Sequence, residues 1–260
     1  MSETILTRIE NNVQVITLNR PDKKNAFNKE MIEAWVKALE SAQQNEDVHV
    51  IVVTGAGNAF CSGGDVGGMT QDQKPLDNKN KLWENIHRIP LTLKTIDKPV
   101  IAAINGPAVG AGLDMALMCD IRTMVSDSKV SEGYVKVGLI PGDGGAFFLP
   151  QIVGEAKALE LLWTGNFISS EEALSLGLVN HTYAQEEFLE KTLQLAEQIA
   201  AGPQVAIRMT KRAVRYSRTM ELEPALDLIS SHYAIIKETD DHKEGVAAFK
   251  EKRKATFTGR

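Results

Sequence analysis

The sequence predicts an α/β fold, in which a core of strands and crossover helices is followed by a helical C-terminal region. Short apolar or alternating runs, which are typical of strands, recur between helical patterns in the first 150 residues. Beyond Pro150 the patterns are almost wholly helical. This order of elements favours one α/β core with a helical appendage. We place the core in residues 1–200 and the helical region in residues 201–260.

The first elements are a predicted hairpin and a helix. Ile5–Glu10 and Val13–Leu18 are alternating runs joined by Asn11-Asn12, and asparagine tolerates the positive φ angles of tight turns. Asn28 is a suitable N-cap for the helix that follows. That helix presents one apolar face, made of Met31, Trp35, Ala38, Leu39 and Ala42.

The middle of the chain alternates between strands and short helices. Val48–Thr54 and Pro99–Ile104 are continuous apolar runs, which indicate strands buried on both faces. Gly110–Met118 is predicted to be a short helix, and Ile121–Val125 another strand. The strands Val48–Thr54 and Pro99–Ile104 are each followed by a glycine-rich turn.

The later helices are marked by end signals. Ser169 to Glu172 form a capping-box pattern, and Gly177 stands where a glycine would end that helix. The Gly202-Pro203 pair separates a helix ending near Ala201 from the next one.

Composition excludes several functional classes. The chain of 260 residues has a net charge of −5 and a pI of about 5.6, which argues against nucleic-acid or anionic-membrane binding. No apolar run approaches the roughly 20 residues of a membrane span, and residues 1–10 show no targeting signal. Two cysteines form no disulfide framework, and scattered histidines predict no metal site. We therefore expect a cytoplasmic protein.

Two glycine-rich turns are the candidate functional loops. One runs from Gly55 to Asp65 and the other from Asn105 to Asp114. Small residues let the backbone approach a ligand closely, and Ala111 stands near a helix start, where N–H groups have no partner. Two such amides facing each other could hold an oxyanion. Alternatively, both loops are ordinary turns between strands and helices.

Other glycine-loop functions fit less well. Met115 stands where a dinucleotide fingerprint needs its third glycine, and no Gly-Lys-Ser/Thr follows a glycine run. Tyr233 and Lys237 have the spacing of a short-chain reductase pair, but no dinucleotide loop precedes them. We interpret that spacing as chance.

Five motifs together resemble the crotonase family, the enoyl-CoA hydratases and isomerases. They occur in order from about residue 5 to the C-terminus. The motifs are Asn19-Arg20-Pro21 with Asn25-Ala26-Phe27, the segment 59–65, the segment 98–106, Ile140-Pro141-Gly142-Asp143-Gly144-Gly145, and the tail 244–253.

The resemblance implies a spiral of ββα units and a C-terminal region that forms trimers or hexamers. It implies an oxyanion hole made by the amides of Gly64 and Ala111. Coenzyme A, as part of the substrate and not as a cofactor, would lie along Lys24, Ala26, Cys61, Gly63, Asp65 and Val66. Phe249 and Lys252 would also contact coenzyme A, and a basic residue near them, from the same chain or from a neighbouring subunit, would reach its phosphates. The polar stretch 71–83 would form a variable wall of the acyl pocket.

The acids depart from the pattern of the family's hydratases, which use two glutamates. The first glutamate position holds Asp114, and the second, counted back from Gly138–Pro141, holds Tyr134. An unionised phenol is a poor base near neutral pH. Asp143 lies in the following turn and could supply the second acid, or could only cap a helix. Glu132, which would share the side of a strand with Tyr134, is a further candidate.

The resemblance implies an enzyme that hydrates or isomerises the double bond of an enoyl-CoA thioester. Thioester hydrolysis, decarboxylation and retro-Claisen cleavage stay open, because one fold supports many reactions. A non-catalytic homologue that binds acyl-CoA or RNA is the alternative from another class.

Overall fold

The computed structural model, which describes residues 3–65 and 74–260, contains a six-stranded sheet in the order β1-β2-β3-β4-β6-β9. The first pair is antiparallel and the others are parallel. The strands are β1 Ile5–Glu10, β2 Val13–Leu18, β3 Val50–Gly55, β4 Val100–Ile104, β6 Ile121–Val125 and β9 His181–Tyr183.

The predicted hairpin and first helix are confirmed. Ile5 pairs with Leu18, and Asn11 and Asn12 have φ angles of 49° and 62°. The Asn28 side chain accepts a hydrogen bond from the backbone N–H of Met31 at the start of helix α1, Lys29–Gln44. These elements form where local sequence predicts them because their signals lie within a few residues of one another.

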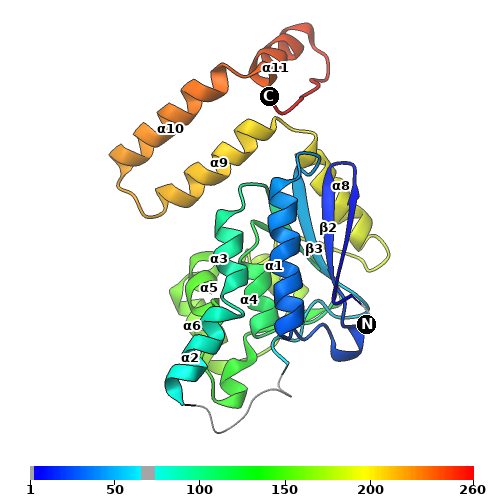
Figure 1. The fold of residues 1–260 in the computed structure, drawn as a ribbon, viewed down its shortest axis with the longest axis vertical. Helices are drawn as coiled ribbons and strands as arrows, with labels where there is room; N and C mark the ends of the chain where they lie inside the picture. The colour runs from blue at the N-terminus through cyan, green and yellow to red at the C-terminus, as the bar shows by residue number, and fades with distance from the viewer. Residues whose placement is uncertain (1–2, 66–73) are drawn as a thin grey trace.

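Helices cover both faces of the sheet (Figure 1). On one face the apolar stripe of α1 packs with α3, Arg88–Thr95, and α4, Ala111–Leu117, in the larger core. On the other face α8, Phe188–Ala200, packs on alternate side chains of the strands in a smaller core. The remaining core helices are α2 Pro75–Glu84, α5 Gly145–Val153, α6 Glu155–Thr164 and α7 Ser170–Ser175, with the short 3₁₀ helix η1 Pro21–Lys23.

A second, smaller sheet lies beside α4. It consists of β5 Ala108–Val109, β7 Lys129–Ser131 and β8 Ile168–Ser169. The chain after β7 does not continue as a strand. It forms the 3₁₀ helix η3, Gly133–Val137, which ends at Gly138 in the left-handed conformation. The expectation that Glu132 and Tyr134 share a strand is therefore wrong. The ladder of β7 stops at Ser131, whose carbonyl oxygen accepts a bond of 2.7 Å from the Gly110 N–H.

The C-terminal region contains helices α9 Gln204–Ser217, α10 Leu222–Lys237 and α11 Asp240–Glu251. They project from the core as an arm (Figure 1). The segment between Pro150 and this arm is less purely helical than the sequence predicted, since β8 and β9 form there and β9 joins the main sheet through pairing with β6. No helix in the described part of the chain is long and apolar enough to cross a membrane.

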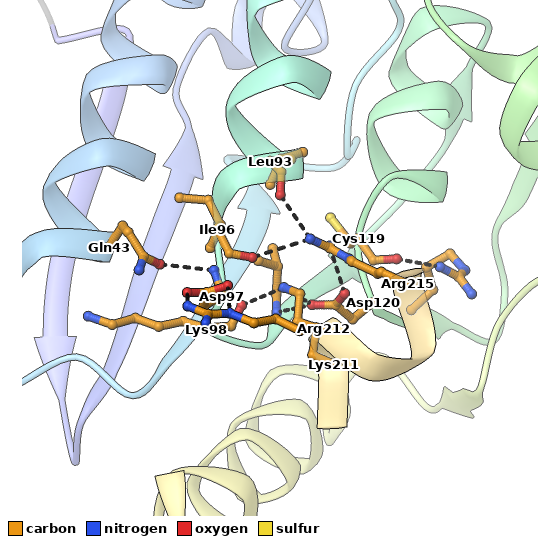
Figure 2. Close-up of polar contacts among 12 residues, drawn as sticks. Gln43, Leu93, Ile96, Asp97, Lys98, Cys119, Asp120, Lys211, Arg212 and Arg215 are labelled. Atoms are coloured by element: carbon orange, nitrogen blue, oxygen red, sulfur yellow. Dashed lines mark hydrogen bonds and ion pairs between the residues drawn. The ribbon is translucent and has the colours of Figure 1, made fainter. Parts of the chain in front are cut away.

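A polar cluster attaches α9 to the core (Figure 2). Asp120 pairs with Lys211 at 2.6 Å and with Arg215 at 3.0 Å. Arg212 pairs with Asp97. These residues join α9 to the loops that precede β4 and β6, while the glycine-rich turns follow the opposite ends of β3 and β4.

Candidate active site

Two carboxyl groups meet at one phenol beside helix α4. The Tyr134 hydroxyl, on η3, lies 2.6 Å from Asp114 Oδ2 and 3.0 Å from Asp143 Oδ2. Asp114 comes from the first turn of α4 and is fully buried, and Asp143 comes from the turn before α5. The structure thus brings together the three side chains that the sequence singled out for proton transfer.

Asp143 is not a helix cap. The residue before α5 is Gly144, with a φ angle of 125°, and no side chain caps that helix. The Asp143 carboxyl is 8% exposed and turned toward Tyr134. The alternative explanation of Asp143 as an N-cap is therefore wrong.

A third carboxyl group and a glycine complete this cluster. Glu132 is 3% exposed, and its carboxyl group lies close enough to Asp114 to lower the pKa of Asp114. A Cβ atom placed on Gly145 would lie 2.4 Å from Asp114 Oδ1 and 3.0 Å from Glu132 Oε2. Only glycine lets the start of α5 approach both carboxyl groups so closely.

Burial controls the proton affinity of the cluster. Burial raises the pKa of Asp114 to about 6, against the lowering effect of the Tyr134 hydroxyl. Burial also raises the pKa of Asp143. The pKa of Tyr134 is raised by burial and by the nearby charge of Asp114, so its hydroxyl keeps its proton near neutral pH. The phenol can therefore donate a hydrogen bond, while Asp114 can gain or lose a proton close to neutrality.

The two glycine-rich turns pack directly against each other. Cys61 forms an isolated bridge with Ala108, and the Val109 N–H donates to the Cys61 carbonyl at 3.0 Å. A Cβ on Gly112 would lie 2.1 Å from that same carbonyl oxygen. Gly63, with a φ angle of 97°, lies so close that its Cβ would be 3.6 Å from the Ala111 nitrogen.

Among the backbone amides of these turns that have no acceptor within the described residues, two flank the carboxyl cluster's helix. They belong to Gly64 and to Ala111, the first residue of α4. Ala111 precedes Asp114 by one helical turn, so its N–H lies close to the carboxyl cluster. The arrangement can stabilise negative charge on an oxygen and move a proton nearby.

The residues predicted to follow coenzyme A form two adjacent segments. The Phe27 N–H donates to the Gly63 carbonyl at 2.9 Å, and the Asp65 N–H donates to the Phe27 carbonyl at 3.0 Å. Lys24 and Ala26 are therefore held beside Gly63 and Asp65. Val66 lies outside the described residues, as does the start of the predicted pocket wall, 71–73, while the rest of that wall is largely helix α2.

Asn25 organises the same region from within. It is fully buried, and its side-chain amide donates to the carbonyl oxygens of Ala56 and Ala59 at 2.9 and 2.8 Å. The Cys61 thiol lies 3.1 Å from the Asn25 carbonyl, and burial raises the pKa of Cys61 to about 12. A thiol with that pKa stays protonated, so Cys61 is a packing residue of the loop and a poor nucleophile.

Phe249 and Lys252 lie on the arm and not at the cluster. Phe249 is 86% exposed on α11, and Lys252 follows as its left-handed C-cap. Figure 1 shows α11 at the opposite end of the molecule from α2 and well away from α4 and α5. A role for these two residues in binding coenzyme A beside this site therefore fits a neighbouring copy of the chain better than the same chain.

Two contacts of the site were not predicted. His87 Nε2 lies 2.8 Å from the Gly142 carbonyl and so ties the α2–α3 junction to the turn that carries Asp143. No local signal indicates this contact, because the residues are 55 positions apart. The role of Gly145 had a signal in the sequence, namely the glycine pair directly after Asp143.

No set of three or more His, Cys, Asp or Glu side chains in residues 3–65 and 74–260 could hold a metal ion.

Known proteins resemble this chain over its whole length. A family model described as enoyl-CoA hydratase/isomerase matches residues 8–260. The chain is 34% identical to the 1,2-epoxyphenylacetyl-CoA isomerase of Escherichia coli strain K12, covering 100% of both. It is 33% identical to the crotonyl-CoA hydratase of Syntrophomonas wolfei, covering 98% of each.

A solved structure agrees with the same assignment. The crystal structure of enoyl-CoA hydratase subunit I from Geobacillus kaustophilus HTA426 superimposes with a TM-score of 0.93 at 36% identity, covering 100% of both chains. The match extends through the C-terminal helices as well as the sheet. By its family model, its relatives and its fold, this chain belongs to the enoyl-CoA hydratase/isomerase family, the crotonase superfamily.

Proposed function

We propose that this protein hydrates or isomerises the carbon–carbon double bond of an enoyl-CoA thioester through a thioester enolate. The observation that carries the proposal is the pair of buried carboxyl groups on Asp114 and Asp143, which share the Tyr134 hydroxyl one helical turn from the Ala111 amide. The enolate oxygen would accept hydrogen bonds from the N–H groups of Gly64 and Ala111. Coenzyme A is part of the substrate, so no separate cofactor is required.

Isomerisation needs a single proton carrier. In the direction from a 3-enoyl to a 2-enoyl thioester, a carboxylate removes a proton from Cα, and the electron pair moves onto the thioester oxygen. The same carboxyl group, or its neighbour, then delivers a proton to Cγ. Asp114, with a pKa of about 6, is suited to both halves of this exchange, because its two protonation states are close in free energy near neutral pH.

Hydration needs two groups. One carboxylate takes a proton from water while the oxygen adds to Cβ, and an acid protonates Cα. Asp143 and Asp114 approach Tyr134 from different elements, so one can position water while the other supplies the proton. The Tyr134 hydroxyl has one proton, so it would donate to the carboxyl group that is ionised and accept from the one that is protonated.

The test uses Asp114→Asn and Asp143→Asn with 2-enoyl- and 3-enoyl-CoA substrates. For hydration, both variants should lose roughly 100-fold or more in kcat. For isomerisation, one loss should be severe and the other mild, and oxygen-18 from solvent should not enter the product. If neither substitution slows either reaction while both variants bind coenzyme A thioesters, the protein is a binding protein and not this enzyme.

No contact in the described residues favours hydrolysis, decarboxylation or retro-Claisen cleavage over the leading reactions. The cytoplasmic location stays a prediction, as does the division at residue 200 into a catalytic core and an oligomer-forming arm. The acidic net charge of −5 supports the expectation that the chain does not bind nucleic acid.

A further inference from the structure

Glu132 is a buried acid for which the proposed reaction has no use. It directly follows β7, and its side chain is 3% exposed. Neither of its carboxyl oxygens has a hydrogen-bond donor among the described residues. It borders a cavity of only about 10 Å³, lined otherwise mostly by apolar side chains such as Leu113 and Leu149, which holds one water at most. An ionised carboxylate in these surroundings would be strongly destabilised.

Asp114 has an oxygen in the same situation. Asp114 Oδ2 accepts the Tyr134 hydroxyl, but Oδ1 is buried and has no hydrogen-bonding partner among the described residues. Asp114 Oδ1 and Glu132 Oε2 lie against the same position on Gly145. Two adjacent carboxylates in an apolar site repel each other, and a single proton between them converts that repulsion into a hydrogen bond.

The surroundings decide which carboxyl group keeps the proton. Asp114 has the Tyr134 hydroxyl as a donor and stands in the first turn of α4, where the helix dipole favours negative charge. Glu132 has neither. The charged groups that act on Glu132 are the acids Asp114, from α4, and Asp143, from the turn before α5; His87, between α2 and α3, acts on Asp143.

We infer that Glu132 is a positioning residue that stays a neutral carboxylic acid near pH 7 and donates a hydrogen bond to Asp114 Oδ1. This bond holds the Asp114 carboxylate with Oδ2 toward Tyr134 and stabilises its ionised form. The inference rests on the proposed function only in taking Asp114 as the group that moves the substrate proton. Burial, and then the charge of Asp114, raise the pKa of Glu132 well above its ordinary value, which agrees with a protonated side chain.

The kinetic test compares Glu132→Gln with Glu132→Met. Glutamine keeps a neutral donor, so kcat/KM should stay within about threefold of the wild type with the same acid limb in its pH profile. Methionine has similar length but no donor, so the pKa of Asp114 should rise. The acid limb should then move to higher pH, with roughly a tenfold loss at pH 6 that largely recovers at pH 9. Exposed Glu160→Met is the matched control.

If Glu132→Gln loses as much activity as Asp114→Asn, Glu132 acts as an ionised base and the inference is overturned. If Glu132→Met shows an unshifted acid limb while folded, the bond to Asp114 does not exist.

A second readout is independent of activity. Infrared spectra of the wild-type protein at pH 7 should contain the C=O band of a protonated carboxylic acid that is absent in Glu132→Gln and present in Glu160→Gln. Absence of such a difference overturns the inference whatever the enzyme catalyses. Conversely, a full-rate Asp114→Asn variant with the Glu132 band intact would refute the proposed role of Asp114 and leave the protonation of Glu132 standing.

Discussion

At the scale of the residue, the proposed chemistry depends on polar groups of the site that have few hydrogen-bonding partners. The amides of Gly64 and Ala111 have no backbone acceptor in the described part of the chain, and the carboxyl group of Asp114 accepts the Tyr134 hydroxyl. Unsatisfied buried groups are costly, so they persist where a ligand or a proton completes them. Each can be tested alone.

Replacing Ala111 by proline should remove one proposed oxyanion donor. Ala111 is the first residue of α4, where proline is tolerated because that N–H has no partner within the helix. We expect kcat to fall about 100- to 1000-fold with the fold retained. Ala111→Gly, which keeps the N–H, is the control and should lose far less. An undiminished kcat in a folded Ala111→Pro protein would refute the oxyanion assignment.

Asp114→Asn should also change the pH dependence of stability. Burial raises the pKa of Asp114 to about 6, so the folded state holds this proton more tightly than the unfolded state. The stability that the protonated group contributes is complete below about pH 4 and is lost as the pH rises through 6, by about 3 kcal/mol at most. The Asn variant avoids this loss. Denaturant unfolding should therefore show that the free energy of unfolding of Asp114→Asn rises relative to that of the wild type between pH 4 and pH 8. A difference between the two proteins that does not change with pH would contradict the effect of burial on Asp114.

At the scale of the element, charged side chains decide how α9 sits on the core. Lys211 is 9% exposed and its pKa is lowered by burial, yet it contacts Asp120 at 2.6 Å and the Lys98 carbonyl at 2.6 Å (Figure 2). Asp120 also accepts the Val100 N–H at 2.8 Å. The Asp120 carboxylate thus joins the start of β4 to the arm. Its removal should therefore destabilise both elements.

Asp120→Asn should destabilise the protein by about 2 kcal/mol, because Lys211 and Arg215 would be left partly buried without their counter-charge. Amide hydrogen exchange should rise mainly in α9. Arg212→Gln is the matched control: the Arg212 side chain is 46% exposed, so that pair should contribute less than about 1 kcal/mol. Equal effects of the two substitutions would mean that burial does not distinguish the two pairs.

At the scale of the whole molecule, the arm of helices α9 to α11 exposes many large apolar side chains. Every residue of helix α10 is described by the structure, and Ala225 is the only one of them that is buried. Large apolar side chains on α9 to α11 are exposed, namely Val214, Tyr216, Leu222, Leu226, Ile229, Tyr233, Ile235, Val246 and Phe249. Surfaces of this kind mark protein interfaces, which supports the proposed self-association.

Sedimentation should therefore show a trimer or a hexamer. Leu226, 52% exposed on α10, is a suitable probe, and Leu226→Asp should shift the protein toward smaller species. Asp227→Asn on the same helix is the control and should leave the assembly size unchanged. A stable wild-type monomer at micromolar concentration would rule out the oligomer.

The sequence by itself determined the features whose causes are local. The hairpin around Asn11-Asn12, the Asn28 cap of α1 and the position of Asp114 one turn after Ala111 all follow from signals a few residues apart. The family followed from five motifs in order, and the comparisons confirm it.

Only the tertiary structure decided how the acids are connected. Tyr134 and Asp114 are 20 residues apart, and His87 and Gly142 are 55 apart, so their contacts depend on which segments the fold makes neighbours. The prediction that Glu132 and Tyr134 lie on one strand was wrong, because the pairing of β7 ends at Ser131. Where a strand stops pairing depends on its neighbours in the sheet, and the local sequence does not show this. Proton affinity depends on burial, and burial is a property of the packed molecule.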